Sequence, residues 1–188
     1  MGDKLDRRKK YTRIVLKESL ITLLARKPIS EITVKEICEL ADINRSTFYT
    51  HYTDQYDLLS KIEEEITEDM NEYLNSYNYP AEEESIQMTQ KILEYVIENK
   101  FMFHTLLKKD ATPTFEKRMM ELTRGFMMNN WMSDNHLGQE EVNYLSTFVI
   151  SGAIHVIKDW IANDMDQSPK DMAYMINNFI NYGFSYLD

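Results

Sequence analysis

Hydrogen-bonding and charged side chains gather between residues 45 and 51 of this 188-residue chain, where six of seven residues are polar, basic or tyrosine. Phe48 and Tyr52 fall four positions apart, so in a helix they share one face and leave the opposite face to the polar residues. Arginine, serine, threonine and tyrosine supply the donors and acceptors that suit base edges and phosphates. The segment therefore favours recognition of a nucleic acid rather than the making or breaking of bonds.

Two short helices separated by a tight turn are predicted to position this segment. Thr33 and Glu36 have the spacing of a capping box that begins the first helix, and Asn44 is a candidate cap for the second. The apolar face of the first helix recurs at helical spacing through Val34, Ile37, Cys38 and Ala41. In a helix-turn-helix the N-terminal part of the second helix enters the major groove. We predict base or groove contacts from Arg45, Tyr49 and Thr50, and DNA-backbone contacts from Thr33, Ser46, Thr47 and His51.

The distribution of charge agrees with this hypothesis although the net charge of −10 does not. Residues 1–35 hold ten Lys or Arg and four acids, a net of +6, whereas the remainder has a net of −16. Such polarity indicates an N-terminal region that approaches a polyanion and a C-terminal region that does not. The alternatives are a solvated basic tail and a helical protein-interaction module whose acidic C-terminal part does the work.

Residues 13–59 resemble the N-terminal DNA-binding domain of the TetR family of bacterial transcriptional regulators. The resemblance lies in Ile-Thr-Val at 32–34, Ser-Thr-Phe-Tyr-x-His-Tyr at 46–52 and Asp-x-x-Asp-Leu-Leu at 54–59. Two positions depart from the family pattern. Asp42 replaces the usual glycine of the turn, and Gln55 replaces a lysine that typically reaches a DNA phosphate. Because Asp tolerates the left-handed conformation better than most residues, we expect the turn to form.

Composition narrows the class of protein further. The single cysteine, Cys38, excludes an intramolecular disulfide and falls on the apolar helix face. The four histidines show no short metal-ligand spacing, and neither a nucleophile elbow nor a phosphate-binding glycine loop is present. No run approaches the eighteen or so apolar residues of a membrane span. We therefore expect a cytoplasmic protein that is not an enzyme, with no metal and no cofactor.

Apolar residues recur at helical spacing almost throughout, so the fold class is predicted to be all-α. We expect a helix-turn-helix domain over residues 1–53 and a helical regulatory and dimerisation domain over 54–188. A long helix from Asp54 to about Tyr77 should link them. The other expected helices cover about 8–26, 81–99, 101–109, a segment opening at Thr112-Pro113, 139–165 and a segment opening at Ser168-Pro169.

The last two helices carry apolar residues on more than one side, which requires more than one packing partner. They resemble the C-terminal pair that forms a four-helix dimer interface in TetR-family proteins, and Phe148-x-x-x-Gly152 with Trp160 resembles a C-terminal type found in part of that family. The alternative is packing within the protomer. The resemblance implies an interface through Val149, Gly152, Ala153, Val156, Trp160, Met172, Ile176, Phe179, Ile180 and Gly183.

The central helices combine aromatic residues with methionine, a mixture that suits either an adaptable apolar ligand pocket or an ordinary core. The candidate pocket residues are Tyr95, Phe103, His104, Phe126, Met127 and Trp131. The resemblance implies a homodimeric repressor that binds a near-palindromic operator in double-stranded DNA and is released by a small-molecule effector. The alternative is a regulator controlled by a protein partner.

Overall fold

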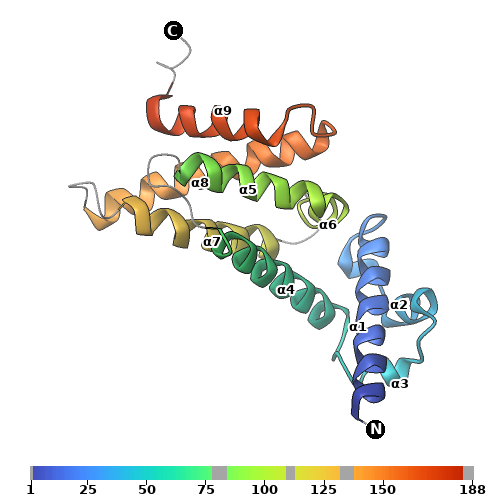
Figure 1. Ribbon diagram of the computed structural model, residues 1–188. Helices are drawn as coiled ribbons and strands as arrows, with labels where there is room; N and C mark the ends of the chain where they lie inside the picture. The colour runs from blue at the N-terminus through green and yellow to red at the C-terminus, as the bar shows by residue number, and fades with distance from the viewer. Residues whose placement is uncertain (1, 78–83, 109–112, 132–137, 184–188) are drawn as a thin grey trace. The chain divides into compact units, whose positions relative to one another are not determined.

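The computed structural model describes residues 2–77, 84–108, 113–131 and 138–183, and within these ranges it contains nine α-helices, one 3-10 helix and no strand. The predicted all-α class is confirmed (Figure 1). The chain divides into two compact units, the first of Met1–Ile66 with Lys108–Thr112 and the second of Thr67–Leu107 with Pro113–Asp188. The division between Ile66 and Thr67 falls inside the helix Gln55–Asn75, so this helix contributes residues to both units. The domain boundary predicted after residue 53 stays a prediction.

The first unit contains α1 (Gly2–Leu24), the 3-10 helix η1 (Ile29–Glu31), α2 (Val34–Ala41), α3 (Arg45–Phe48) and the first part of α4 (Gln55–Asn75). Its core is formed by fully or almost fully buried side chains from all four α-helices. They are Leu16, Leu20, Ile21, Ile37, Cys38, Phe48, Leu58, Leu59 and Ile62. Lys17 of α1 also pairs with Glu65 of α4. These contacts hold the short helices α2 and α3 against two longer ones.

The start of α4 was predicted at Asp54, and the hydrogen bonds there confirm it. Asp54 Oδ1 accepts from the backbone N–H of Tyr56 at 2.9 Å and from that of Asp57 at 2.8 Å. Asp57 Oδ2 in turn accepts from the backbone N–H of Thr53 at 2.9 Å. The two carboxylates therefore satisfy N–H groups that a helix leaves without intrahelical partners and lie favourably at its positive end.

Asp42 ends α2 in the left-handed conformation, with φ 54° and ψ 43°. The backbone N–H of Ile43 donates to the carbonyl of Cys38 at 3.0 Å, which is the long hydrogen bond of a Schellman motif. The expectation that Asp would allow the turn is thus confirmed. The tight turn sets the directions of α2 and α3, so the αL residue at position 42 positions the polar segment that follows it.

Replacing Asp42 by glycine is expected to stabilise the protein, since glycine reaches the left-handed region without a steric penalty. The gain should be about 0.5–1 kcal/mol in the free energy of unfolding, with a rise of roughly 1–4 °C in Tm. Thermal and urea unfolding of Asp42→Gly beside the wild type measure it. Asp42→Val should have the opposite effect, and a Val variant as stable as the wild type would contradict this account of the turn.

The second unit contains the end of α4 together with α5 (Glu84–Glu98), α6 (Lys100–Leu106), α7 (Pro113–Trp131), α8 (Gln139–Ala162) and α9 (Pro169–Tyr182). Helix α5 packs along α9, and α7 packs along α8. Lys158 of α8 pairs with Glu116 of α7 at 2.8 Å. As predicted, Ser168 caps α9, accepting from the backbone N–H of Asp171 at 3.1 Å ahead of Pro169. Residues 78–83, between the helix expected to end near Tyr77 and the one expected from residue 81, lie outside the described residues.

Helix α8 is unusually apolar for a helix of which so little is buried in the protomer. Over Glu140–Ala162 it is long and apolar enough, by length and composition alone, to cross a membrane, although only 22% of that window is buried. The sequence criterion of a continuous apolar run did not select it, because Asn143, Lys158 and Asp159 interrupt the apolar residues. Much of the apolar surface of α8 is therefore exposed in the protomer.

Candidate nucleic-acid interface

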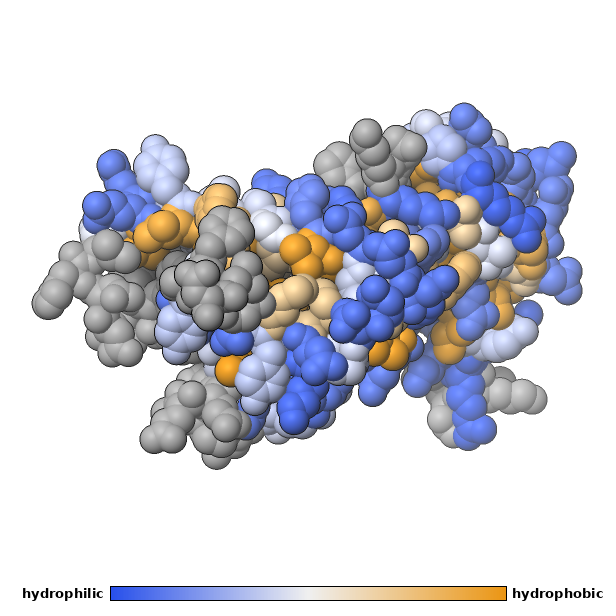
Figure 2. Space-filling view, turned by 90° about the horizontal axis from the view of Figure 1, so that it is seen from above, coloured by the Kyte–Doolittle hydropathy of each residue, from blue (hydrophilic) through white to orange (hydrophobic). Residues whose placement is uncertain are grey.

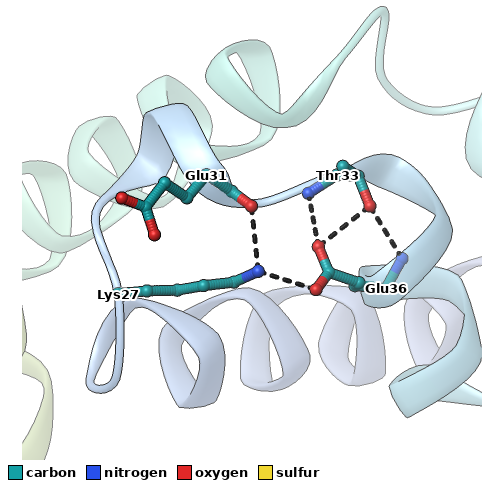
Figure 3. A network of polar contacts seen from close by, with 4 residues as sticks. All are labelled: Lys27, Glu31, Thr33 and Glu36. Carbon is teal, nitrogen blue, oxygen red and sulfur yellow. Dashed lines mark hydrogen bonds and ion pairs between the residues drawn. The ribbon is translucent and has the colours of Figure 1, made fainter.

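The first helix of the predicted helix-turn-helix begins in a network of four residues (Figure 3). The backbone N–H of Thr33 donates to Glu36 Oε2 at 2.9 Å, and Thr33 Oγ1 accepts from the backbone N–H of Glu36 at 3.3 Å, so the predicted capping box is present. Lys27 Nζ adds a 2.6 Å ion pair to Glu36 Oε1 and a 2.8 Å hydrogen bond to the Glu31 carbonyl. The network joins the loop after α1 to the start of α2.

The Glu36 carboxylate is strongly stabilised in its ionised form by this network. The hydrogen bond from Lys27, followed by those from the backbone and the hydroxyl of Thr33, lowers the pKa of Glu36 to about 2. A depressed carboxylate pKa contributes stability that is present above the ordinary value of 4.5 and is lost as the pH falls towards 2. At neutral pH the cap is therefore fully formed.

The second helix starts at the predicted cap, because Asn44 Oδ1 accepts from the backbone N–H of Ser46 at 2.9 Å. Its α-helical part is one turn long and ends at Phe48, shorter than the motif at 46–52 suggested. The chain then continues in turns, with Thr50 N donating to the Thr47 carbonyl at 3.1 Å and His51 N to that of Phe48 at 2.9 Å. These i→i+3 bonds tighten the end of the helix and keep residues 49–51 beside the helical turn.

The two faces of this segment are arranged as predicted. Phe48 and Tyr52 are buried, with 0% and 5% of their surfaces exposed, while Tyr49 is 58% exposed. The ring of Tyr49 stands edge-on to that of Phe48 at 5.5 Å, so an exposed aromatic side chain rests on a buried one. The other residues of the segment are either exposed or half-buried. Arg45, Ser46 and Thr50 are exposed, as is Thr33, whereas Thr47 and His51 are half-buried.

The N-terminal part of α1 runs close to α3 and the turns that follow it (Figure 1), and its Arg13 and Lys9 act electrostatically on His51. Partial burial first, and then the positive charges of Arg13 and Lys9, lower the pKa of His51. Arg13 and Lys9 are both exposed. A phosphate placed here would face two permanent cations and an imidazole whose protonation it would favour. Gln55, where the resemblance would place a lysine, is half-buried and adds no charge.

The predicted ligand-pocket residues are only partly brought together. Tyr95 and Phe103 are buried, and their rings meet at 6.0 Å between centroids, while Phe103 also meets Phe115 at 5.7 Å. His104 is exposed. Phe126, Met127 and Trp131 belong to α7, but their side chains lie outside the described residues. None of Tyr95, Phe103 and His104 lines the cavity found in this unit, because the two rings fill the space between α5, α6 and α7 themselves.

A different set of residues lines that cavity, which has a volume of about 140 Å³ and is walled by α4, α5, α7, α8 and α9. Four predicted interface residues belong to this lining: Val149, Ala153, Ile176 and Ile180. Sequence reasoning missed this role, since a side chain lining a cavity and one lining an interface have the same apolar character. The only available signal was Asn177, a polar residue in the apolar stripe of α9.

The apolar residues exposed on α8 and α9 form two stripes that share Gly152, Val156 and Phe179 with the predicted interface. The α8 stripe consists of Tyr144, Leu145, Phe148, Gly152 and Val156, and the α9 stripe of Tyr174, Met175, Phe179 and Tyr182. Trp160, Met172 and Ile176 are buried inside the protomer, where the Trp160 indole N–H donates to the Gln167 carbonyl at 3.0 Å. Gly183 ends α9 with φ 59°. Seen from the side on which α9 lies, apolar side chains reach the surface among polar ones (Figure 2).

The capped helix pair, with its buried aromatic face and outward polar face, defines a helix-turn-helix protein. A family model for the C-terminal region of TetR-type transcriptional regulators matches residues 83–182, more than half of the chain. The chain belongs to the TetR family of transcriptional regulators. The family to which the resemblance at residues 13–59 pointed is thereby confirmed, and the protein is a DNA-binding transcriptional regulator by family.

Individual relatives agree with this assignment. The chain is 27% identical over 114 residues to the uncharacterized HTH-type transcriptional regulator YxbF of Bacillus subtilis, a match covering 56% of this chain and 29% of that relative's length. A TetR transcriptional regulator from Streptococcus agalactiae has a similar fold, with a TM-score of 0.75, 22% identity and coverage of 96% and 99% of the two chains. The dihydroxyacetone kinase operon activator DhaS gives a TM-score of 0.60, 19% identity and coverage of 93% and 97%.

Proposed function

We propose that the protein is a homodimeric repressor that binds a near-palindromic operator and is released from it by a small-molecule effector. The observation that carries the DNA-binding part is the exposed row of Arg45, Ser46, Tyr49 and Thr50, on a segment of one helical turn and following turns whose other face is buried. The rigid attachment of this row to the core keeps its polar groups in one orientation, as groove recognition requires.

The residues divide by the kind of contact that we propose for them. Arg45, Tyr49 and Thr50 contact base edges or the groove, because they stand on the outward side of the segment. Ser46 and Thr33 lie at helix N-termini, where hydroxyl and N–H groups bind phosphate. Thr47 and His51, which are half-buried beside the exposed row, also contact the DNA backbone. Lys9 and Arg13, beside His51, extend the surface proposed to bind DNA phosphates onto α1.

The dimer is proposed to form through the exposed stripes of α8 and α9. Phe148 is 71% exposed and Tyr144 79%, which is unfavourable for aromatic residues in an isolated protomer. A two-fold axis would place each stripe against its copy and set the two recognition segments about one DNA turn, or a small multiple of it, apart. The interface is accordingly assigned to Phe148, Gly152, Val156 and Phe179 rather than to the buried Trp160 and Met172.

The lining of a cavity in the second unit supports the proposed release by an effector. Its cavity is lined in part by Met70 and Leu74 of α4, the helix whose first part belongs to the first unit. An effector that prefers one position of α4 would shift the dimer between two states, and a coupling of about 1–3 kcal/mol changes operator affinity roughly five- to 150-fold. DhaS, a protein of similar fold, is named an operon activator. Whether this protein represses or activates transcription is therefore measured separately.

Selection from random duplex DNA tests the proposed function and supplies the operator at the same time. We expect a motif with two inverted half-sites. Affinity for the selected duplex should fall by orders of magnitude between about 50 and 200 mM salt if roughly six or more phosphates are contacted. Transcription from the selected site, with and without the protein, then distinguishes a repressor from an activator.

A helical interaction module is the second candidate, and the exposed apolar stripes of α8 and α9 are the observation that favours it. It would hold if the selection enriched no motif and if binding to DNA were uniform across sequences.

The proposed activity needs no catalytic group and places the protein in the cytoplasm with the chromosome. A protein partner in place of the small-molecule effector is the alternative mode of control.

A further inference from the structure

The cavity of the second unit combines apolar walls with a hydrogen-bonded polar pair, of which Asn177 is buried and Thr89 half-buried. Most of its lining is aliphatic, with Ile150 and Ile154 from α8 and Leu74 from α4. Asn177 of α9, 4% exposed, and Thr89 of α5 also line it. Asn177 Nδ2 donates to Thr89 Oγ1 at 2.9 Å and to the Ala173 carbonyl at 2.9 Å. The pair joins α5 to α9 across the cavity wall.

One acceptor of the Asn177–Thr89 pair makes no hydrogen bond within the described part of the chain. Thr89 Oγ1 donates its own hydrogen to the Ser85 carbonyl at 2.8 Å, and both N–H groups of Asn177 are engaged. Asn177 Oδ1, however, accepts no hydrogen bond from any donor in the described part of the chain. Because Asn177 lines the cavity, its carboxamide oxygen can accept a hydrogen bond from water or from a ligand there.

We propose that this cavity binds a compact, uncharged, largely apolar molecule that donates one O–H or N–H hydrogen bond to Asn177 Oδ1. The volume of about 140 Å³ fixes the size, since an apolar cavity of about 150 Å³ in another protein takes a single benzene ring. No charged residue occurs among the described lining residues. An ionised carboxylate or ammonium would therefore enter without a counter-charge, at a large desolvation cost.

The action of such a ligand on DNA binding rests on the proposed function. Met70 and Leu74 bring the end of α4 to the cavity, so occupancy would alter the packing of the helix that links the two units. Binding of the ligand itself is independent of that step. A protein that took the ligand but bound no operator would contradict the proposed function and leave the site intact.

The test uses phenol, benzene and benzoate as probes of the full chain in the absence of DNA, with affinities measured by calorimetry. Phenol should bind at least as well as benzene, because its hydroxyl finds an acceptor, and benzoate should not bind. In Asn177→Leu the acceptor is gone. Phenol affinity should then fall roughly five- to 150-fold, as expected for burial of an unpaired hydroxyl, while benzene affinity changes little.

A second variant keeps the test decisive if Asn177→Leu fails to fold. Ala153→Leu, which adds a branched side chain at the cavity wall, should abolish binding of both phenol and benzene. Ala162→Leu on the same helix, at an exposed position, is the matched control and should bind both. Three results would overturn the proposal: benzoate binding as tightly as phenol, undiminished binding in Ala153→Leu, or no binding of phenol and benzene to the wild type.

Discussion

The Phe148→Asp protein is expected to sediment as a folded monomer at micromolar concentrations at which the wild type is a dimer. Phe148 is 71% exposed in the protomer, so the change removes little packing inside it. Burial of a phenylalanine contributes roughly 1.5–3 kcal/mol, and the two-fold axis repeats that loss in both protomers. The introduced carboxylates would in addition be desolvated without partners at the interface.

Loss of the dimer should also remove operator binding. A monomer reaches one half-site, and the loss of simultaneous engagement is expected to weaken binding roughly 100- to 10,000-fold. Phe101→Asp is the matched control, because Phe101 is also exposed, at 57%, but lies on α6. Circular dichroism establishes that both variants fold. A Phe148→Asp protein that remained a dimer would exclude the α8 stripe from the interface, and a monomeric wild type would remove the proposed dimer altogether.

Arg45→Ala is expected to weaken operator binding and to relax its selectivity at one base pair in each half-site. Arg45 is the first residue of α3, exposed, and directly follows the Asn44 cap. This is the part of a recognition helix that enters the major groove. A bidentate contact between arginine and guanine is worth roughly 1–3 kcal/mol of discrimination, which corresponds to about five- to 150-fold in affinity for each half-site.

Alanine variants of two other arginines distinguish the loss of a base contact from the loss of a positive charge. Arg26 follows α1 at the end opposite Lys9 and Arg13, so Arg26→Ala removes the same charge away from the recognition segment. Its binding should change little. Arg13→Ala should weaken binding to all sequences alike and lower the salt slope by about one. The assignment of Arg45 fails if its alanine variant binds the selected operator and its base-substituted versions with wild-type affinities.

Much of the candidate site could be predicted from the sequence because it depends on residues three or four positions apart. The capping box of Thr33 and Glu36, the Asn44 cap and the division of residues 45–52 into buried and exposed faces are all local. Asp42 belongs to the same group, since its left-handed conformation depends on its own side chain and the turn around it. Local geometry of this kind follows from residue type and spacing with little help from distant contacts.

Only the tertiary structure decided which apolar side chains face one another across helices. Ile176 and Phe179 share a helix and a chemical character, yet Ile176 lines a cavity while Phe179 is 40% exposed. Tyr95 and Phe103 proved to be partners in a ring cluster rather than lining residues of that cavity. The hydrophobic effect is non-directional and rewards burial against any apolar neighbour. Periodicity therefore identified the apolar stripes, whereas packing between distant helices determined whether each residue belongs to core, cavity or surface.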